Sequence, residues 1–554
     1  MPFRRLLAVG SVAVALALAV YLPVSAAGWL SASAHSNAIP TVAHPAITYK
    51  AAGKLKTTTP IKHLVVIFGE NVSFDHYFGT YPHAANLAGE TKWVAKKGTP
   101  SVNGLTPALL THNPNQDNPV RLSPKQALTC DMNHNYAPEQ KAEDGGLMDR
   151  FVQNLTGSPY TAYEYCPADI DMGYYDGNTV TGLWNYAQNF ALNDNSWDTD
   201  YGPSTPGAVN LISGDTGAVL CGPSGADLNV SPCTATPPTY TAGQTLGTNF
   251  GDDDPYYDIC SNNYDRTPAK DIALTGPNIG TMLDSAKVTW GWFQGGFGDC
   301  MSATPPLDGP TLGLQAQGAT VAQDPGDETT DYSPHHEPFQ YYASTSNPNH
   351  LPPTSVAMIG SEDQANHQYD ISWFWKAADS GHLPAVSFLK APRFEDGHPD
   401  YSDPLDEQNF DVSTINALEK LKTWSSTAVV ILYDDSDGWY DHDYGPKINQ
   451  SNASIDSFCG TTASGSQPGR CGYGPRLPLL VISPYSKVNS VDHSLTDQTS
   501  VIQFIEDNWL HGARVSSESF DNWAGSLDSM FSFKGKARAP KLFMNPETGI
   551  ITKH

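Results

Sequence analysis

The sequence predicts an α/β protein with a mostly parallel sheet between helices and with long loop insertions. Short apolar runs, each followed by polar residues, are typical of strands buried on both faces of a parallel sheet. Segments with apolar residues at helical spacing alternate with these runs. The 43 Pro and 47 Gly gather in the polar stretches between them and indicate loops. The predicted strands are Leu64–Phe68, Leu383–Leu389, Ala428–Tyr433 and Leu477–Ser483.

The N-terminus predicts an export signal. Arg4 and Arg5 precede the apolar stretch 6–24, and small residues follow at 24–26. The stretch is long enough to leave an uncleaved anchor as the alternative, and the two arginines leave twin-arginine export open. We therefore expect a secreted or periplasmic protein. The expected parts are a signal peptide at 1–27, an Ala/Ser/Thr/Pro-rich arm at 28–58, one catalytic domain at 59–530 and a tail at 531–554.

Charge and cysteine content narrow the partners and the compartment. A formal net charge of −27 repels nucleic acid and anionic membranes, so neither is an expected partner and no stable membrane insertion is expected. The 8 cysteines all follow the signal, and an even count in an exported chain predicts disulfides. Cys221–Cys233 and Cys459–Cys471 are the predicted pairs because they are close in sequence. The remaining pairing stays open.

The first strand ends at a candidate site. Glu70 and Asn71 follow Gly69 directly. In open α/β sheets the carboxyl ends of the strands form the ligand-binding edge. Carboxylate and amide oxygens are good ligands for hard cations. The alternative is a solvated turn with no chemistry.

The same segment carries a family resemblance. ENVSFDHYFGTYP, from Glu70 to Pro82, resembles the E-N-R-S-F-D-H-Y-F-G signature of the bacterial phosphoesterase family that holds secreted phospholipases C and acid phosphatases. Val72 stands where the family usually has Arg. The resemblance covers most of residues 60–510 in separated blocks and implies an alkaline-phosphatase-like fold. It also implies that Asn71, His134 and His336 bind the phosphate.

A serine at a predicted helix start is the candidate nucleophile. After a helix expected within 180–195, a turn at 201–203 leads to a helix beginning near Ser204, with this serine as its N-cap. Free N–H groups and the positive dipole end at such a terminus favour an alkoxide and a phosphate. The family places its nucleophile in a similar G-P-[ST]-x-P segment, which implies Ser204, with Thr205 as the fallback. A capping role alone is the alternative.

The middle of the chain adds loops and histidines. Residues 215–275 are expected to form a disulfide-pinned loop excursion, and 281–296 a helix and a strand. His335 and His336 lie in a loop where the family has His or His-His, although a surface pair is the alternative. A helical pattern spans 363–378, and His398 follows the strand that ends at Leu389.

The third strand ends in a pair of carboxylates. Asp434 and Asp435 at the mouth of a buried strand are costly unless ionic partners hold them. A divalent cation is such a partner. An Asp-rich turn is the alternative, but the segment resembles the family's YD[DE]xxGxYDH. Helices are expected at 413–424, with Ser413 as the cap, and from about Thr499.

Together these residues predict in-line displacement at phosphorus. Ser204 attacks and forms a phosphoserine that water hydrolyses, with His336 or His398 as the general acid for the leaving alcohol. One divalent cation, of unassigned identity, would supply the charge that activates the hydroxyl and screens the phosphoryl oxygens. Charged histidines would favour mildly acidic pH. The predicted ligands are Glu70, Asn71, Asp434 and Asp435, and the predicted catalytic residues are Ser204, His134, His335, His336 and His398.

The substrate class remains divided. Ser at position 204, the Asp-Asp pair and the His-His pair favour an acid-phosphatase-like enzyme acting on phosphate esters. A phospholipase C acting on phosphatidylcholine-type lipids is the alternative, so the partner is a small phosphate ester or a phospholipid. A sulfatase is disfavoured because Ala208 stands where its motif needs Arg. A non-catalytic extracellular structural protein is the least favoured function.

Overall fold

The computed structural model describes residues 44–156, 166–221, 244–261, 271–300, 330–447, 470–535 and 539–553. The predicted signal peptide and the first part of the arm lie outside the described residues. The chain from Thr41 onward forms one compact unit. No helix within these ranges is long and apolar enough to cross a membrane.

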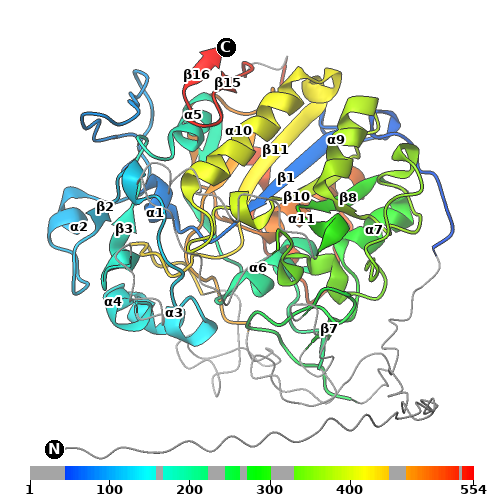
Figure 1. The fold of residues 1–554 in the computed structure, drawn as a ribbon, viewed down its shortest axis with the longest axis horizontal. Helices are drawn as coiled ribbons and strands as arrows, with labels where there is room; N and C mark the ends of the chain where they lie inside the picture. Colours follow the sequence, from blue (N-terminus) through cyan, green and yellow to red (C-terminus); the bar gives the residue numbers. More distant parts are fainter. Residues whose placement is uncertain are drawn as a thin grey trace, which may run out of the picture. The chain divides into compact units, whose positions relative to one another are not determined.

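A mostly parallel sheet forms the centre of the molecule, as predicted (Figure 1). β1 lies in the middle and pairs in parallel with β10 and β11. β12 is the exception, because it runs antiparallel to both β11 and β4. In the described part of the chain the strand order is β13 (Ser490–Asp492), β4 (Ala191–Asn193), β12 (Leu479–Ile482), β11 (Thr427–Tyr433), β1 (His63–Gly69), β10 (Val386–Lys390), β8 (Trp290–Gln294) and β9 (Gln368–Asp370).

Helices cover both faces of this sheet, which confirms the expected fold class. Every residue of β1 is buried, so its side chains pack alternately into two cores. Val65 and Ile67 face α5 (Thr181–Asn189), α9 (Ile371–Ser380) and α10 (Pro404–Lys420). Leu64, Val66 and Phe68 face α6 (Ser204–Ser213), α7 (Ile279–Ala286) and α11 (Thr499–Trp509).

Two helix boundaries differ from the prediction. α10 begins at Pro404 rather than Ser413, because the Asp403 carboxylate accepts hydrogen bonds from the backbone of the first turn and proline suits that turn. Ser413 is an exposed residue inside this helix and caps nothing. α9 begins at Ile371, since 368–370 forms the edge strand β9.

Smaller elements surround the core. The C-terminal hairpin packs on α10, where the Asn416 amide donates to the Met544 carbonyl at 2.7 Å and the Glu419 carboxylate accepts from the Leu542 N–H at 2.9 Å. The small helices are α1 (Phe74–Phe78), α2 (Pro107–Thr111), α3 (Tyr136–Glu143) and α4 (Phe151–Asn154). The small sheets pair β2 (Val120–Arg121) with β3 (Gly173–Tyr174), β5 (Ser196–Trp197) with β14 (Thr496–Asp497), β6 (Val219–Leu220) with β7 (Ala273–Leu274), and β15 (Phe543–Met544) with β16 (Ile551–Lys553).

Disulfides fasten the loops. Cys130 pairs with Cys166, and Cys260 pairs with Cys300. Cys221 and Cys471 are also disulfide-bonded. The predicted pairs Cys221–Cys233 and Cys459–Cys471 each include a cysteine outside the described residues, so they stay predictions.

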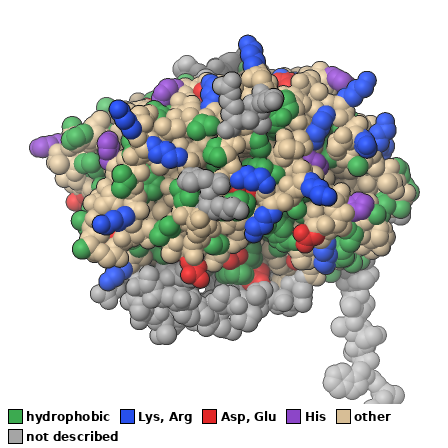
Figure 2. All heavy atoms as spheres, turned by 90° about the horizontal axis from the view of Figure 1, so that it is seen from above, with side chains coloured by type: hydrophobic (Ala, Val, Ile, Leu, Met, Phe, Trp, Pro, Cys, Tyr) green, Lys and Arg blue, Asp and Glu red, His purple; other side chains and the backbone are tan. Residues whose placement is uncertain are grey.

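The surface does not reflect the net charge evenly. Figure 2 shows a face on which Lys and Arg side chains are spread among polar and hydrophobic ones, although the chain carries a formal charge of −27. Acidic side chains are sparse on this face. The acidic excess therefore does not act as one uniform repulsive field around the molecule.

The start of α6 packs directly on the end of β11. A Cβ at Gly207 would lie 2.1 Å from the carbonyl oxygen of Asp434, and backbone cannot easily yield. The absence of a side chain at Gly207 therefore lets the first turn of α6 approach the strand end.

Gly207→Ala is expected to destabilise the protein by about 1–3 kcal/mol through overpacking, although Ala is otherwise the better helix former. Urea unfolding would measure the change in free energy. Gly53→Ala is the matched control, because a Cβ there meets no atom within 4 Å. Equal stability of the two variants would contradict the close approach.

Candidate active site

The ends of adjacent strands bring the predicted acidic residues together. Gly69 and Tyr433 are partners in the parallel register of β1 and β11, so Glu70 and Asp434 leave the sheet side by side. Asn71 takes a left-handed backbone conformation, with φ of 52°, which Asn tolerates better than most residues. Its N–H donates to the Asp434 carboxylate at 3.0 Å. The two acidic segments therefore form one site.

Ser204 joins this site from α6. It is the first residue of the helix, with Pro203 rather than Ser204 in the cap position. Its hydroxyl donates to Asp435 Oδ2 at 3.0 Å and lies 3.5 Å from Glu70 Oε2. The Ser204 hydroxyl therefore does not cap the helix, and it faces two carboxylates at the helix N-terminus.

The carboxylates are buried and only partly satisfied. Glu70, Asp434 and Asp435 are each at most 1% exposed. Asp434 Oδ1 accepts from the backbone N–H groups of Asn71 and Asp435, but Asp434 Oδ2 and Asn71 Oδ1 have no hydrogen-bond donor. Buried oxygens without donors are costly. They fit a hard divalent cation, which takes oxygen ligands of this kind.

Burial and mutual repulsion shift the titration of this cluster. Burial and the neighbouring Glu70 charge raise the pKa of Asp434 to about 6. Burial likewise raises the pKa of Asp435 well above its ordinary value. Burial would also raise the pKa of Glu70, but the ammonium of Lys390 outweighs it and holds this pKa low. The site therefore needs positive charge to keep all its carboxylates ionised.

His335 and His336 lie in the short 3-10 helix η6 (Pro334–His336) rather than in a loop, and their environments differ. His336 is buried, and its Nδ1 lies 2.7 Å from Oε1 of Glu70, a predicted metal ligand. Burial and the neighbouring His335 charge lower its pKa well below the ordinary value. His335 stacks edge-on against His336 and faces Asp254 at 3.7 Å. Burial opposes its protonation, yet Asp254 raises its pKa to about 9.

His134 and His398 both lie beside Asp131 and Asp437. His134 Nδ1 is 3.3 Å from Asp131 and 3.5 Å from Asp437. Burial disfavours its charged form, but Asp435 and Asp131 raise its pKa well above the ordinary value. His398 clusters with the same two carboxylates, Asp131 and Asp437. The histidines thus divide into His336, which is neutral, and His134 and His335, which carry a proton at neutral pH.

Several site residues were missed from the sequence. Lys390 ends β10 and its ammonium contacts Glu70 Oε1. Asp437 is fully buried and accepts from the Asn71 amide at 3.2 Å. Lys390 could have been found by the rule that identified Glu70 and Asp434, since it follows an apolar strand at the same edge. Asp437 lies inside the acidic motif and had no separate signal.

An arginine-centred cluster connects the segments that follow the two acidic strand ends. The fully buried Arg476 donates to Asp75 at 3.2 Å and to Asp441 at 3.1 Å, and His442 contacts Asp75 at 2.5 Å. Asp75 and Asp441 follow the two segments that carry the predicted metal ligands, so Arg476 links these segments. The Arg476 guanidinium already supplies the positive charge in this cluster.

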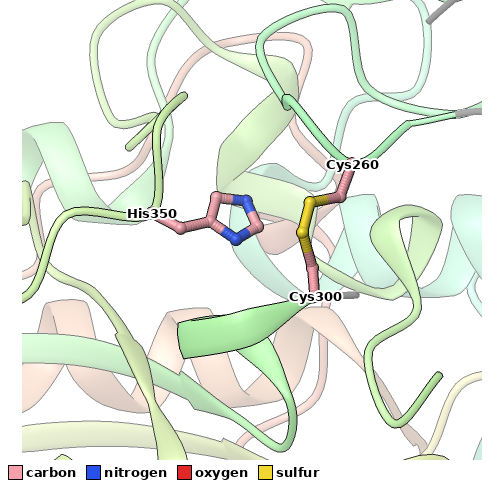
Figure 3. Close-up of side chains that lie close together, drawn as sticks. All are labelled: Cys260, Cys300 and His350. Atoms are coloured by element: carbon pink, nitrogen blue, oxygen red, sulfur yellow. A yellow bond between two sulfur atoms is a disulfide. The ribbon is translucent and has the colours of Figure 1, made fainter. Parts of the chain in front are cut away.

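A trio of Cys260, Cys300 and His350 is not a metal centre. Figure 3 shows the two cysteines joined in a disulfide beside the imidazole. Disulfide sulfurs are not thiolate ligands. His350 instead stacks on Phe297, with ring centroids 3.8 Å apart, and contacts Asp258 at 2.9 Å.

The part of the chain that contains the candidate site matches a known protein family. Residues 61–510 match the model of the Phosphoesterase family. The chain belongs to the phosphoesterase family. The resemblance of Glu70–Pro82 to the family signature is thereby confirmed at the level of the whole domain.

Three of the curated relatives are bacterial phospholipases C. The chain is 23% identical over 542 residues to the non-hemolytic phospholipase C of Pseudomonas aeruginosa, covering 93% of this chain and 63% of the relative. It is 25% identical over 529 residues to that of Burkholderia pseudomallei, covering 92% and 64%. Phospholipase C A of Mycobacterium tuberculosis is 23% identical over 491 residues, covering 86% and 78%. The chain thus spans slightly less than two thirds of the first two relatives.

A solved structure from Bacteroides thetaiotaomicron, from work on glycosaminoglycan metabolism, aligns with 68% of this chain and 75% of its own at 12% identity. Its TM-score of 0.27 is too low to support an argument about fold or function.

Asp434→Asn is expected to abolish stabilisation by a divalent cation while preserving the fold. The Asn oxygen can keep the two backbone hydrogen bonds, which places an NH₂ group where the unpartnered Oδ2 stands. Thermal unfolding of chelator-treated protein with added Mn²⁺ would measure this. A wild-type rise in Tm that Asp434→Asn retains would contradict the cation site.

Arg476→Met is expected to lower the free energy of unfolding by about 3–5 kcal/mol, because it leaves Asp75 and Asp441 buried without their counter-charge. Burial already raises the pKa of Asp441 to about 7. When the pKa of a carboxyl group is higher in the folded than in the unfolded protein, the free energy of unfolding falls as pH rises. The variant should therefore be less stable at pH 8 than at pH 5. Arg150→Met, at the exposed ion pair with Asp144, should lower the free energy of unfolding by no more than about 1 kcal/mol. Urea unfolding at both pH values tests this, and a variant that is more stable at pH 8 than at pH 5 would contradict it.

Proposed function

We propose that this chain is a metal-dependent phosphoesterase that hydrolyses phosphate esters through a phosphoserine intermediate. The observation that carries the proposal is the position of the Ser204 hydroxyl, 3.0 Å from Asp435 and 3.5 Å from Glu70 at the start of α6. These side chains come from separate parts of the sequence and meet in a buried, oxygen-rich site. Membership of the phosphoesterase family supports the same reaction class.

Ser204 is the nucleophile of the proposed reaction. Its oxygen forms a bond to phosphorus while the bond from phosphorus to the leaving alcohol breaks, and water then hydrolyses the phosphoserine. Asp435 is placed to accept the hydroxyl proton, because it already accepts the hydrogen bond. The positive end of the α6 dipole, at Ser204, would favour the negative charge of the phosphoryl group, while the Thr205 N–H donates to Asp252 Oδ1 at 2.9 Å.

One divalent cation, held by Glu70, Asn71, Asp434 and Asp435, would supply positive charge for the nucleophile and the phosphoryl oxygens. The histidines act around it. His134 and His335 carry protons at neutral pH and balance phosphate charge. Asn71 and His134, which both contact Oδ1 of Asp437, bind the substrate. His398 or His336 protonates the leaving alcohol. His398 is the better placed donor, since the pKa of His336 is low.

The main candidate is an acid-phosphatase-like enzyme acting on monoesters. The serine at 204, the Asp434–Asp435 pair and the His335–His336 pair support it. A phospholipase C acting on phosphodiesters is the second candidate, favoured by the names of the curated relatives. The export prediction belongs to either, and the disulfides Cys130–Cys166 and Cys260–Cys300 suit an oxidising compartment.

Ser204→Ala is expected to reduce hydrolysis by at least about 10⁴-fold, because the covalent step needs this oxygen. Turnover of p-nitrophenyl phosphate and of p-nitrophenylphosphorylcholine would be measured with the purified, metal-loaded protein. The faster wild-type substrate identifies a monoesterase or a diesterase.

Thr205→Ala is the matched control, since it removes the neighbouring hydroxyl, which lies near Tyr341 rather than in the carboxylate cluster. It should keep activity within about tenfold. Near-normal turnover by Ser204→Ala, or collapse of both variants with an intact fold, would overturn the nucleophile assignment.

A further inference from the structure

A buried lysine lies against the cation site. Lys390 is fully buried, and its ammonium contacts Oε1 of Glu70. The same ammonium lies 5.2 Å from the ring centroid of Phe68, so it also faces an aromatic ring. A lysine is almost never fully buried unless a charged partner holds it. Its partner here is a predicted metal ligand rather than a structural carboxylate.

The contact divides the two oxygens of Glu70. Oε1 faces Lys390 and His336, while Oε2 faces the Ser204 hydroxyl at 3.5 Å. Oε2 is therefore the oxygen turned toward the predicted cation. An outer partner that occupies one carboxylate oxygen fixes the other in place.

Lys390 also changes the charge of the site. Glu70, Asp434 and Asp435 contribute three buried carboxylates, and Asp437 lies beside them. One divalent cation leaves this set negative, and the ammonium removes a further unit of negative charge. A fixed positive charge a few ångströms from a divalent cation repels it, and the repulsion is strong at the effective dielectric of a protein interior.

Building on the proposed function, we propose that Lys390 is a positioning residue that serves as the second positive charge of a single-cation site. It fixes Glu70 as a one-oxygen ligand and weakens cation binding, so that the site accepts one divalent ion instead of collecting more. The lysine thereby occupies the electrostatic place that a second metal ion holds in two-metal phosphoesterases.

The two roles of Lys390 have opposite effects on affinity, which makes them separable. Loss of an outer partner typically weakens metal binding by about 10- to 100-fold. Loss of the positive charge strengthens binding, and the direct Coulomb term is the larger of the two. We therefore expect Lys390→Met to bind Mn²⁺ at least about tenfold tighter than wild type.

A variant series tests this with Mn²⁺ alone, counted as free ion by electron paramagnetic resonance at pH 8. Lys390→Gln keeps a hydrogen-bond donor without charge and should bind as tightly as Lys390→Met or tighter. Lys390→Arg keeps the charge and should bind like wild type. Lys541→Met is the control for loss of a lysine away from the site. This exposed lysine donates to the Glu419 carbonyl on α10, and its loss should not change Mn²⁺ binding.

Folding is tested with the same proteins. Without metal, Lys390→Met should unfold at a lower temperature than wild type, because Glu70 loses its counter-charge. Added Mn²⁺ should raise its Tm by more than it raises that of wild type, since tighter binding stabilises more. If metal-free Lys390→Met is partly unfolded, Lys390→Gln takes its place in this comparison of the Tm with and without Mn²⁺.

The outcomes separate this proposal from the function. Wild-type binding of Mn²⁺ with equal or weaker binding by Lys390→Met and Lys390→Gln would overturn the role of Lys390 alone. Tight binding by Lys390→Arg would overturn it as well, because the charge would then not matter. If neither wild type nor any variant binds Mn²⁺, the cation site of the proposed function fails and this proposal fails with it. Loss of the Ser204 assignment would leave the binding result standing.

Discussion

Buried negative charge at the carboxyl edge of the sheet is the constraint on which this structure depends. β1 and β11 each end in acidic residues that the fold hides from water. Ionised carboxylates in such a place are stable only with positive partners and donors. Lys390, the backbone N–H groups of Asn71 and Asp435, and the predicted cation supply them in the site, while Arg476 does so behind it.

The rest of the fold is arranged so that other elements can reach this edge. Gly207 lets α6 approach the backbone of Asp434, which brings Ser204 into contact with Asp435. The left-handed conformation at Asn71 turns the chain so that its N–H meets Asp434. Each is a local compromise in backbone or side-chain choice, and each makes sense only when both strand ends are considered together.

The strands and their acidic ends were predictable because burial on both faces leaves a clear apolar pattern and because strand ends share an edge. The helix start at Ser204, the candidate nucleophile, could be predicted because a Gly-Pro-Ser turn marks it. The start of α10 was misplaced because apolar spacing after Ser413 outweighed the stronger signal of Asp403 and Pro404. The direction of β12 could not be predicted, since an antiparallel strand buried on both faces has the same composition as a parallel one.

Partnerships between distant residues were the least predictable part. Lys390 and Glu70 are far apart in sequence, and nothing local to either shows that an ammonium meets a carboxylate. The pairing of Arg476 with Asp75 and Asp441 is similar. Such contacts depend on strand order, which sequence periodicity does not encode.

The reversal of β12 changes which connections can influence chemistry. In an all-parallel sheet, the segment entering a strand lies at the far rim. Because β12 runs the other way, the residues that lead into it reach the catalytic rim, where the Arg476 carbonyl accepts from the Phe74 N–H at 2.7 Å. Substitutions just upstream of β12 therefore act at the edge of the sheet that holds the candidate site, whereas substitutions just downstream of it act at the opposite edge.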